Sequence, residues 1–165
     1  MNETIKAIKN RRSHRAYLDK PIGKEILSEI IDCARLAPSA VNIQPWEFVI
    51  VTDKVMLKKI SEQATYGKFI KNAGACVIVL CKDSNYFLED GCAATENILI
   101  AAESFGIGSC WVAANTKPYC KDIMELIEVP QGYNVVSILS LGYYEKPINP
   151  PRKRALKDVL HWEKF

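Results

Sequence analysis

The sequence predicts an α+β fold, a three-layer arrangement in which helices flank a small central sheet. Segments with helical spacing of apolar residues alternate along the chain with short segments rich in β-branched residues. The run from Ala75 to Cys81 is continuously apolar, as a strand buried on both faces would be. A chain of 165 residues, 48% of them hydrophobic and 25% charged, has the size and composition of one compact domain. We therefore expect a single domain over residues 1–165.

The apolar spacing also places the individual helices and strands. Residues 2–9 and 23–37 have helical spacing, with a break at Lys20 to Gly23. Residues 87–105 form the longest helical pattern, apolar around nearly its whole circumference, which indicates a buried helix that packs against a partner subunit. The other expected elements are helices at 54–64 and 119–127 and strands at 46–51, 75–81, 109–113 and 134–142.

The composition argues against several classes of protein. The formal net charge is only +3 and the Lys and Arg residues are spread along the chain, so we expect no nucleic-acid partner. The first ten residues form an amphipathic helical pattern and not a signal peptide. Apolar stretches such as residues 98–102 are far too short to cross a bilayer. We therefore expect no membrane association and a location in the cytoplasm.

The cysteines are expected to be reduced thiols. Most of the six lie inside apolar periodic segments, where a free cysteine behaves as a small hydrophobe. They are Cys33, Cys76, Cys81, Cys92, Cys110 and Cys120. No CxxC pair exists, and neither His14 nor His161 has metal-ligand spacing from a cysteine pair, so we expect no metal site.

Two basic clusters lie near the two ends of the chain. Residues 11–15 (RRSHR) follow the first expected helix and combine guanidinium groups, which suit phosphate oxygens, with a hydroxyl donor. Residues 150–154 (PPRKR) lie in a Pro-rich tail that we expect to be irregular up to about Leu156. Considered alone, each cluster is better explained as solvated surface charge. Together, the two could converge on one phosphate.

A turn-rich segment at residues 37–46 (APSAVNIQPW) connects an expected helix to an expected strand. Ser39, Asn42 and Gln44 offer hydroxyl and amide groups that can bind a ligand's carbonyl and hydroxyl groups without introducing charge. An ordinary turn with local side-chain caps is the better explanation when the segment is considered alone.

The segment at residues 105–114 (FGIGSCWVAA) joins the longest expected helix to a strand. Its small residues would let a flat ring approach the backbone, although a helix C-cap explains Gly106 and Gly108 equally well. It lacks a full GxGxxG between a strand and a helix, so a Rossmann dinucleotide site is unsupported. Cys110 has no histidine nearby in the sequence, which disfavours thiol catalysis.

The chain also lacks the signatures of several common chemistries. It has no Walker loop, HExxH, GxSxG or paired-carboxylate pattern on one helix face. Hydrolysis and phosphoryl transfer therefore have no visible apparatus. A bound cofactor that supplies the reactivity would explain this absence.

The order of these segments resembles the FMN-dependent nitroreductase family. The match runs through RRSxRxY at 11–17, APSAxNxQPW at 37–46, DGCAA at 90–94, GIG at 106–108 and LGY at 141–143 to a basic tail ending in HW at 161–162. The resemblance implies a nitroreductase-like three-layer fold with a mostly antiparallel sheet. It also implies a homodimer with exchanged C-terminal tails that binds FMN at the subunit interface. Such an enzyme passes electrons from NADH or NADPH to nitroaromatic, quinone or similar acceptors by a ping-pong scheme.

The resemblance also implies which residues would bind FMN. The phosphate, ribityl chain and pyrimidine edge would contact Arg11, Arg12, Ser13 and Arg15. The other subunit would supply Pro38, Ser39, Ala40 and Asn42, with Gln44 close by. Backbone donors near flavin N5 would come from Trp111, Val112, Ala113 and Ala114, and the phosphate would also meet Arg152 and Arg154. We expect no side chain to be an obligatory acid or base, because the flavin carries the chemistry.

The chain departs from the family pattern in two places. Residues 111–114 read WVAA where many members have Pro-x-Glu-Gly, so a Glu contact to the flavin is lost. Residues 66–72 lead almost directly into a strand, without room for a long helical excursion over the active site. We therefore expect an open pocket with little selectivity among flat acceptors.

Other functions also fit the sequence. A flavin enzyme of another specialisation, such as dehalogenation, flavin fragmentation or enoate reduction, would share the same segments. A non-catalytic FMN-binding redox sensor and a small basic nucleic-acid-binding domain are alternatives from other classes. The choice between NADH and NADPH has no fingerprint in the sequence.

Overall fold

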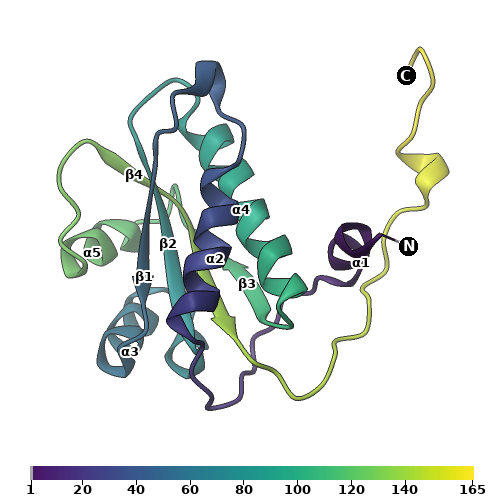
Figure 1. Cartoon of the computed structure of the whole chain (residues 1–165). Coiled ribbons are helices and arrows are strands. Elements are labelled where there is room, and N and C mark those ends of the chain that lie inside the picture. The colour runs from purple at the N-terminus through teal and green to yellow at the C-terminus, as the bar shows by residue number, and fades with distance from the viewer. Residues whose placement is uncertain (1) are drawn as a thin grey trace.

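The computed structural model describes residues 2–165, and these fold into five α-helices and a four-stranded sheet (Figure 1). In chain order the elements are α1 (Glu3–Asn10), α2 (Lys24–Arg35), β1 (Trp46–Val51), α3 (Lys54–Gln63), β2 (Ala75–Lys82), α4 (Phe87–Ser104), β3 (Gly108–Val112), α5 (Tyr119–Leu126) and β4 (Tyr133–Gly142). Within the described chain, no helix is long and apolar enough to cross a membrane. The predicted α+β fold is confirmed.

The sheet is antiparallel throughout and has the strand order β1-β2-β4-β3. The strands β2 and β4 therefore form the centre, and β1 and β3 are the edges. A register shift between Val79 and Leu80 interrupts the β2–β4 ladder once, as a β-bulge does. The edge position of β3 leaves one side of that strand without a partner strand.

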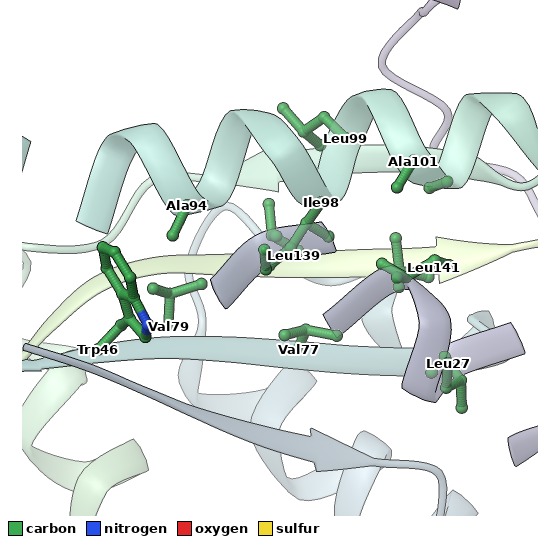
Figure 2. Close-up of a cluster of buried hydrophobic side chains, with 14 of the residues drawn as sticks. Leu27, Trp46, Val77, Val79, Ala94, Ile98, Leu99, Ala101, Leu139 and Leu141 are labelled. Atoms are coloured by element: carbon green, nitrogen blue, oxygen red, sulfur yellow. The ribbon is translucent and has the colours of Figure 1, made fainter. Parts of the chain in front are cut away.

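The sheet separates two apolar cores, so the fold has three layers. On β2, Val77 and Val79 belong to the core beneath α2 and α4, whereas Ile78 and Leu80 belong to the core beneath α3 and α5. Side chains alternate between the two faces of a strand, so a strand covered on both faces requires an unbroken apolar run. Figure 2 shows the first core, in which Val77 and Val79 lie on the side of the sheet that faces Ile98 of α4.

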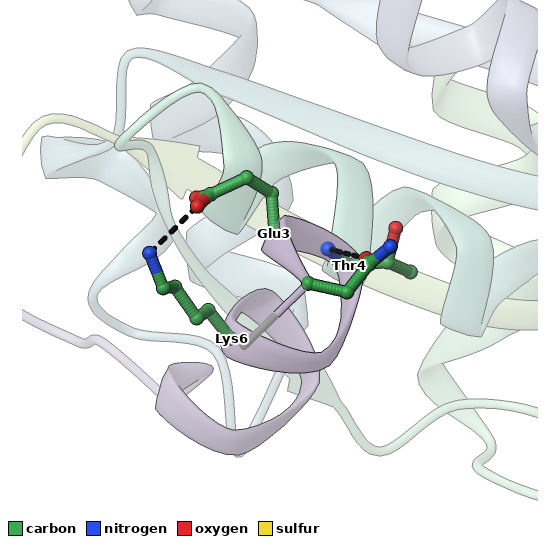
Figure 3. A network of polar contacts seen from close by, with 4 residues as sticks. Glu3, Thr4 and Lys6 are labelled. Atoms are coloured by element: carbon green, nitrogen blue, oxygen red, sulfur yellow. Dashed lines mark hydrogen bonds and ion pairs between the residues drawn. The ribbon is translucent and has the colours of Figure 1, made fainter.

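Local signals in the sequence fix the ends of several helices. The Asn2 side chain accepts a hydrogen bond from the Thr4 N–H at 2.8 Å and so caps α1, while Lys6 pairs with Glu3 at 2.6 Å on the same helix (Figure 3). Asp53 caps α3 in the same way through the Met56 N–H at 2.7 Å.

The prediction that the second helix extends to residue 37 is wrong by two residues. Helix α2 ends at Arg35. Pro38 follows shortly after, and the residue before a proline is sterically disfavoured in helical conformation. The other predicted bounds agree with the structure to within one residue.

Helix α4 is the central helix of the fold. Eight residues of α4 are buried, including Ile98 and Leu99. It packs against α1, α2 and the sheet.

The C-terminal tail lies outside this core. Residues 145–165 are exposed, and Figure 1 shows this tail running away from the sheet past α1. One 3₁₀ turn at Leu156–Asp158 is its regular structure, which confirms the predicted irregularity up to about Leu156.

Candidate functional site

The Arg-rich segment after α1 lies along the outer edge of β3. Ser13 forms a parallel bridge with Ser109, and the His14 N–H donates to the Ser109 carbonyl at 2.9 Å. Tyr17 Oη donates to the His14 carbonyl and is hydrogen-bonded to Ser140 Oγ, each at 2.6 Å. These contacts fix the segment against both β3 and β4, so its side chains have a defined position on the fold.

Two glycines allow this close approach. Gly108 and Gly142 face each other in the β3–β4 register. A Cβ atom at Gly108 would lie 2.7 Å from His14 Cγ, and one at Gly142 would lie 2.6 Å from the Tyr17 ring. Any larger residue would push the segment away from the sheet. In the sequence, Gly142 belongs to the segment LGY at 141–143. Its close packing against Tyr17 becomes evident only in the folded chain.

The cationic side chains of the segment surround a cavity. Arg11, Arg12, Ser13 and Arg15 line a hollow of about 330 Å³. Arg12 donates to the carbonyls of Lys9 and Arg11, at 2.8 Å each, and Arg15 donates to the Ser13 carbonyl at 3.3 Å. Within residues 2–165, none of these arginines forms an ion pair with a carboxylate. We call this set of four residues the cationic cradle.

One buried donor at the cradle and one on the neighbouring strand β3 lack an acceptor. Arg12 Nε and Ser109 Oγ are both buried without a hydrogen-bond partner among the described residues. Ser109 itself is only 2% exposed. A buried donor without an acceptor destabilises a fold by roughly 1–3 kcal/mol. The unpaired Arg12 Nε, at a hollow lined by three arginines, fits an oxyanion such as a phosphate, which accepts several hydrogen bonds and supplies negative charge.

Burial shifts the pKa values of the titratable groups Cys110 and His14 near the cradle. Burial raises the pKa of the Cys110 thiol, although Arg15, Arg11 and Ser13 act in the opposite direction. A thiol with a raised pKa is a poor nucleophile at neutral pH, in line with the expectation that thiol catalysis is disfavoured. Burial and the Arg12 guanidinium lower the pKa of His14, whose ring stacks on Tyr144 at 3.8 Å.

Strand β3 offers backbone groups next to the cradle. The Ser109 carbonyl points to the outer edge, where it binds His14, and strand alternation places the Trp111 N–H and C=O on that same edge. The Trp111 side chain is 37% exposed, whereas Val112 and Ala114 are buried in the core beneath α3 and α5. The Ala113 carbonyl accepts a hydrogen bond from Tyr119. Residues 111–114 thus combine an anchored backbone with one free edge.

The turn-rich segment before β1 is strained and exposed. Val41, Asn42 and Gln44 have φ values of 46°, 58° and 50°, in the left-handed region that non-glycine residues rarely adopt. Ser39 Oγ accepts from the Gln44 N–H at 3.0 Å, so the local side-chain cap that was weighed for this segment is present. Pro38 is exposed and Ala40 is half-buried. Strain of this kind clusters at ligand-binding sites.

One chain does not bring this segment to the cradle. The segment lies at the N-terminal end of α4, and the cradle lies beside β3, which begins just past the C-terminal end of α4 (Figure 1). With 18 residues, α4 is about 27 Å long. The two groups of predicted FMN-binding residues are therefore separated by the length of the central helix.

The basic tail reaches the cradle through a residue that the sequence did not single out. Lys153 lines the cavity together with the cradle residues. Its neighbours Arg152 and Arg154 do not line it, and the Arg154 guanidinium donates to the Asp158 carbonyl within the tail.

Fold and site together define a class of protein, a small three-layer α+β protein with a cationic cradle on an edge strand. Comparison with known proteins gives the family: residues 8–86 and 61–143 match the nitroreductase family model. The chain belongs to the nitroreductase family.

Individual relatives agree with this membership. A candidate NADH dehydrogenase/NAD(P)H nitroreductase of Archaeoglobus fulgidus is 42% identical over 100% of both chains. The FMN reductase (NAD(P)H) of Bacillus subtilis is 30% identical, covering 87% of this chain and 66% of the relative. Among solved structures, an FMN-dependent nitroreductase from Clostridium difficile R20291 superposes with a TM-score of 0.91 at 32% identity, covering 98% of this chain and 99% of that one.

Proposed function

We propose that this protein is an FMN-dependent oxidoreductase that passes electrons from NADH or NADPH to nitroaromatic, quinone or similar acceptors by a ping-pong scheme. Membership of the nitroreductase family supports an NAD(P)H-dependent flavin enzyme. The names of relatives point to the same cofactors, because one is an FMN reductase (NAD(P)H) and another an FMN-dependent nitroreductase. The single observation that carries the proposal is the cationic cradle, in which Arg12 Nε is buried and unpaired within the described chain.

The cradle is the proposed seat of the FMN phosphate and the adjoining ribityl chain. Arg11, Arg12 and Arg15 provide guanidinium forks, and Ser13 adds a hydroxyl donor. Arg12 Nε has no acceptor of its own in the described chain, so a phosphate oxygen would satisfy it. In this proposal Lys153 is the tail residue nearest the phosphate, and Arg152 and Arg154 are the further tail residues that would contact it.

A second copy of the chain completes the proposed site. Ser39, Ala40 and Asn42 lie about the length of α4 away from the cradle of their own chain. A two-fold dimer would place the segment of one subunit against the cradle of the other. The exposed left-handed residues of the segment support this assignment, since a strained, outward-facing loop is typical of a ligand contact.

The outer edge of β3 is the proposed seat of the flavin ring. Bound FMN supplies hydride acceptance and donation at that ring. The chain's own part is to orient the ring and to donate hydrogen bonds from backbone groups at Trp111 to Ala114, which fixed N–H groups do without reorganisation. No side chain is assigned as an acid or base, because the pKa of the neighbouring Cys110 is raised by burial and solvent can supply protons.

A broad acceptor range is part of the proposal. Between α3 and β2 the chain forms a single 3₁₀ turn at Ile70–Asn72, so no long helical segment is inserted there. An edge strand without such a cover leaves a flat acceptor free access to the ring. One acceptor turned over far faster than all others would count against this part.

The test is steady-state oxidation of NADH and NADPH with FMN-loaded protein. We expect both flat nitroaromatics and quinones to stimulate oxidation, with parallel double-reciprocal plots as a ping-pong scheme requires. Loaded protein that consumes neither reductant with any acceptor would favour an FMN-binding sensor. Protein that takes up no FMN would overturn the assignment.

A further inference from the structure

A buried carboxylate holds the strained segment before β1 to the central helix. Asp90 lies in the first turn of α4 and is 5% exposed. Its Oδ1 accepts a hydrogen bond from the Ala40 N–H at 3.0 Å. Its Oδ2 has no partner among the described residues. This contact lies far from the cradle, and the sequence patterns did not single it out for binding.

Within the described chain, this contact is the one hydrogen bond that joins residues 39–44 to a distant element. Within residues 2–165, the other hydrogen bonds of residues 39–44 are local, such as those from Gln44 N–H to Ser39 Oγ and from Asn42 N–H to the Ser39 carbonyl, each at 3.0 Å. Packing does not replace it, because Val41 is 96% exposed and Ile43 is 54% exposed. The segment therefore keeps its left-handed conformations without the burial of its own side chains.

Burying the Asp90 carboxylate to make one hydrogen bond is energetically unfavourable. A buried carboxylate must be desolvated, and one of its oxygens remains unpaired. No Lys or Arg within the described chain forms an ion pair with it, and the positive end of α4 is the favourable charge nearby. Charge-assisted hydrogen bonds are roughly twice as strong as neutral ones. A strong, directional anchor is what a strained loop needs in order to keep one shape.

We propose that Asp90 is a positioning residue for cofactor binding, and that its carboxylate sets the shape of residues 39–44 so that this segment can contact the FMN bound by the partner subunit. The inference rests on the proposed function for its ligand. It assigns to Asp90 a role exerted through the Ala40 backbone, without direct contact with the reacting atoms.

The test compares three variants by FMN affinity and by amide hydrogen exchange. Asp90→Ala removes the acceptor, and Asp90→Asn keeps an oxygen but removes the charge. Thr95→Val is the matched control: Thr95 is fully buried on the same helix and bonds Ser137 Oγ at 2.7 Å, away from the segment. Quenching of flavin fluorescence gives the FMN Kd, and exchange measured without FMN reports on the peptide covering residues 38–45.

Asp90→Ala should raise the FMN Kd by about 10- to 100-fold, as expected for a lost hydrogen bond to a charged group. It should also speed exchange of the 38–45 peptide. Asp90→Asn should show a smaller rise in Kd, and Thr95→Val should lower the Tm with wild-type Kd and exchange. Asp90→Ala with wild-type Kd and exchange would overturn the inference. If Asp90→Ala does not fold, Asp90→Asn decides in the same way against Thr95→Val.

The two readouts separate this inference from the proposed function. Wild-type protein that binds no FMN would refute the proposed function. The exchange experiment would still report whether Asp90 orders the segment. Normal FMN binding by the wild type together with unchanged exchange in Asp90→Ala would refute the inference alone.

Discussion

At the residue scale, the candidate site combines guanidinium groups that have no carboxylate partner in the described chain with buried donors that have no acceptor. Arg12 Nε and Ser109 Oγ are buried and unpaired, and none of the cradle arginines has a carboxylate partner in the described chain. The fold holds these groups in place through the backbone, as when His14 binds Ser109. In the proposed function, an anion bound at the cradle would supply acceptors to these groups.

Arg11→Gln should weaken FMN binding with little effect on folding. The Arg11 side chain lines the cradle and is not a donor in any hydrogen bond or ion pair of the described structure, so its loss removes charge without removing an internal contact. We expect the FMN Kd to rise about tenfold or more. Fluorescence titration and thermal unfolding measure the two effects.

Arg35→Gln is the control for this charge change. Arg35 pairs with Asp32 at 2.5 Å on the exposed side of α2, and surface pairs of this kind contribute about 0–1 kcal/mol. It should leave the FMN Kd unchanged. Equal FMN affinity in the two variants would show that the cradle is not the phosphate site.

His14 should make the folded protein sensitive to mild acid. Its pKa is lowered from 6.5 by burial and by Arg12, so below that pH the unfolded chain binds a proton that the folded chain does not. The free energy of unfolding should therefore fall as pH falls from about 7 toward 5. His14→Phe keeps a ring against Tyr144 and should lose this part of the pH dependence. Identical pH profiles of unfolding for the two proteins would contradict the assignment.

At the scale of elements, the start of β3 and the end of β4 decide where the cradle lies. Gly108 and Gly142 oppose each other, and their missing side chains leave room for His14 and Tyr17. The same two strands leave the outer edge of β3 free beyond Ser109. Cradle and free edge are therefore adjacent because a single bridge pairs the edge strand with the Arg-rich segment.

Gly142→Ala should damage both stability and cofactor binding. The new Cβ would lie 2.6 Å from the Tyr17 ring, which must move and take the attached segment with it. Overpacking of this kind costs about 1–3 kcal/mol. Urea unfolding and FMN titration measure the two losses.

Leu139→Ala separates the two effects of the glycine substitution. Leu139 lies on the same strand in the core beneath α2 and α4. Its truncation should lower stability by about 2–5 kcal/mol but leave the cradle residues in place. If Leu139→Ala weakened FMN binding as much as Gly142→Ala, general destabilisation would explain both.

Much of this element structure could be predicted from the sequence, because it depends on local patterns. The apolar run at 75–81 identified the central strand, and the spacing of 87–105 identified the buried helix. The strand order β1-β2-β4-β3 could not be derived, since it depends on contacts between distant segments.

Parts of the candidate site also required the structure. No glycine marks the left-handed conformations of Val41 and Asn42, and the hydrogen bond from Ala40 to Asp90 joins residues far apart in the chain. The facing of Lys153, rather than Arg152, toward the cradle likewise depends on how the irregular tail lies. Resemblance to the family located the segments, but it did not supply these contacts.

At the scale of the whole molecule, the proposed function requires two copies of the chain. The cradle and the segment at 38–44 lie at opposite ends of α4, about 27 Å apart along the helix. The tail is exposed throughout, and its apolar residues Leu156 and Trp162 lie outside the core. A homodimer would bring each cradle to a partner's segment and give the tail a surface to cover.

Subunit complementation should reveal this shared site. One chain carries Arg11→Gln and Arg15→Gln, and the other carries Ser39→Ala and Asn42→Ala. Each homodimer should be nearly inactive, whereas the purified heterodimer has one site built from two intact halves and should recover about half of the wild-type NAD(P)H oxidation rate. A heterodimer as inactive as its parents would mean that both groups of residues serve the same subunit.

The most direct measurement is the visible absorption spectrum of the purified, FMN-supplemented protein before and after NADH or NADPH is added without oxygen. We predict that the protein retains flavin through gel filtration and that its two flavin bands bleach when reductant is added, as in a reducible flavoprotein. A protein that emerges colourless would contradict the account. Flavin bands that persist with both reductants would contradict the oxidoreductase assignment while leaving the binding site in place.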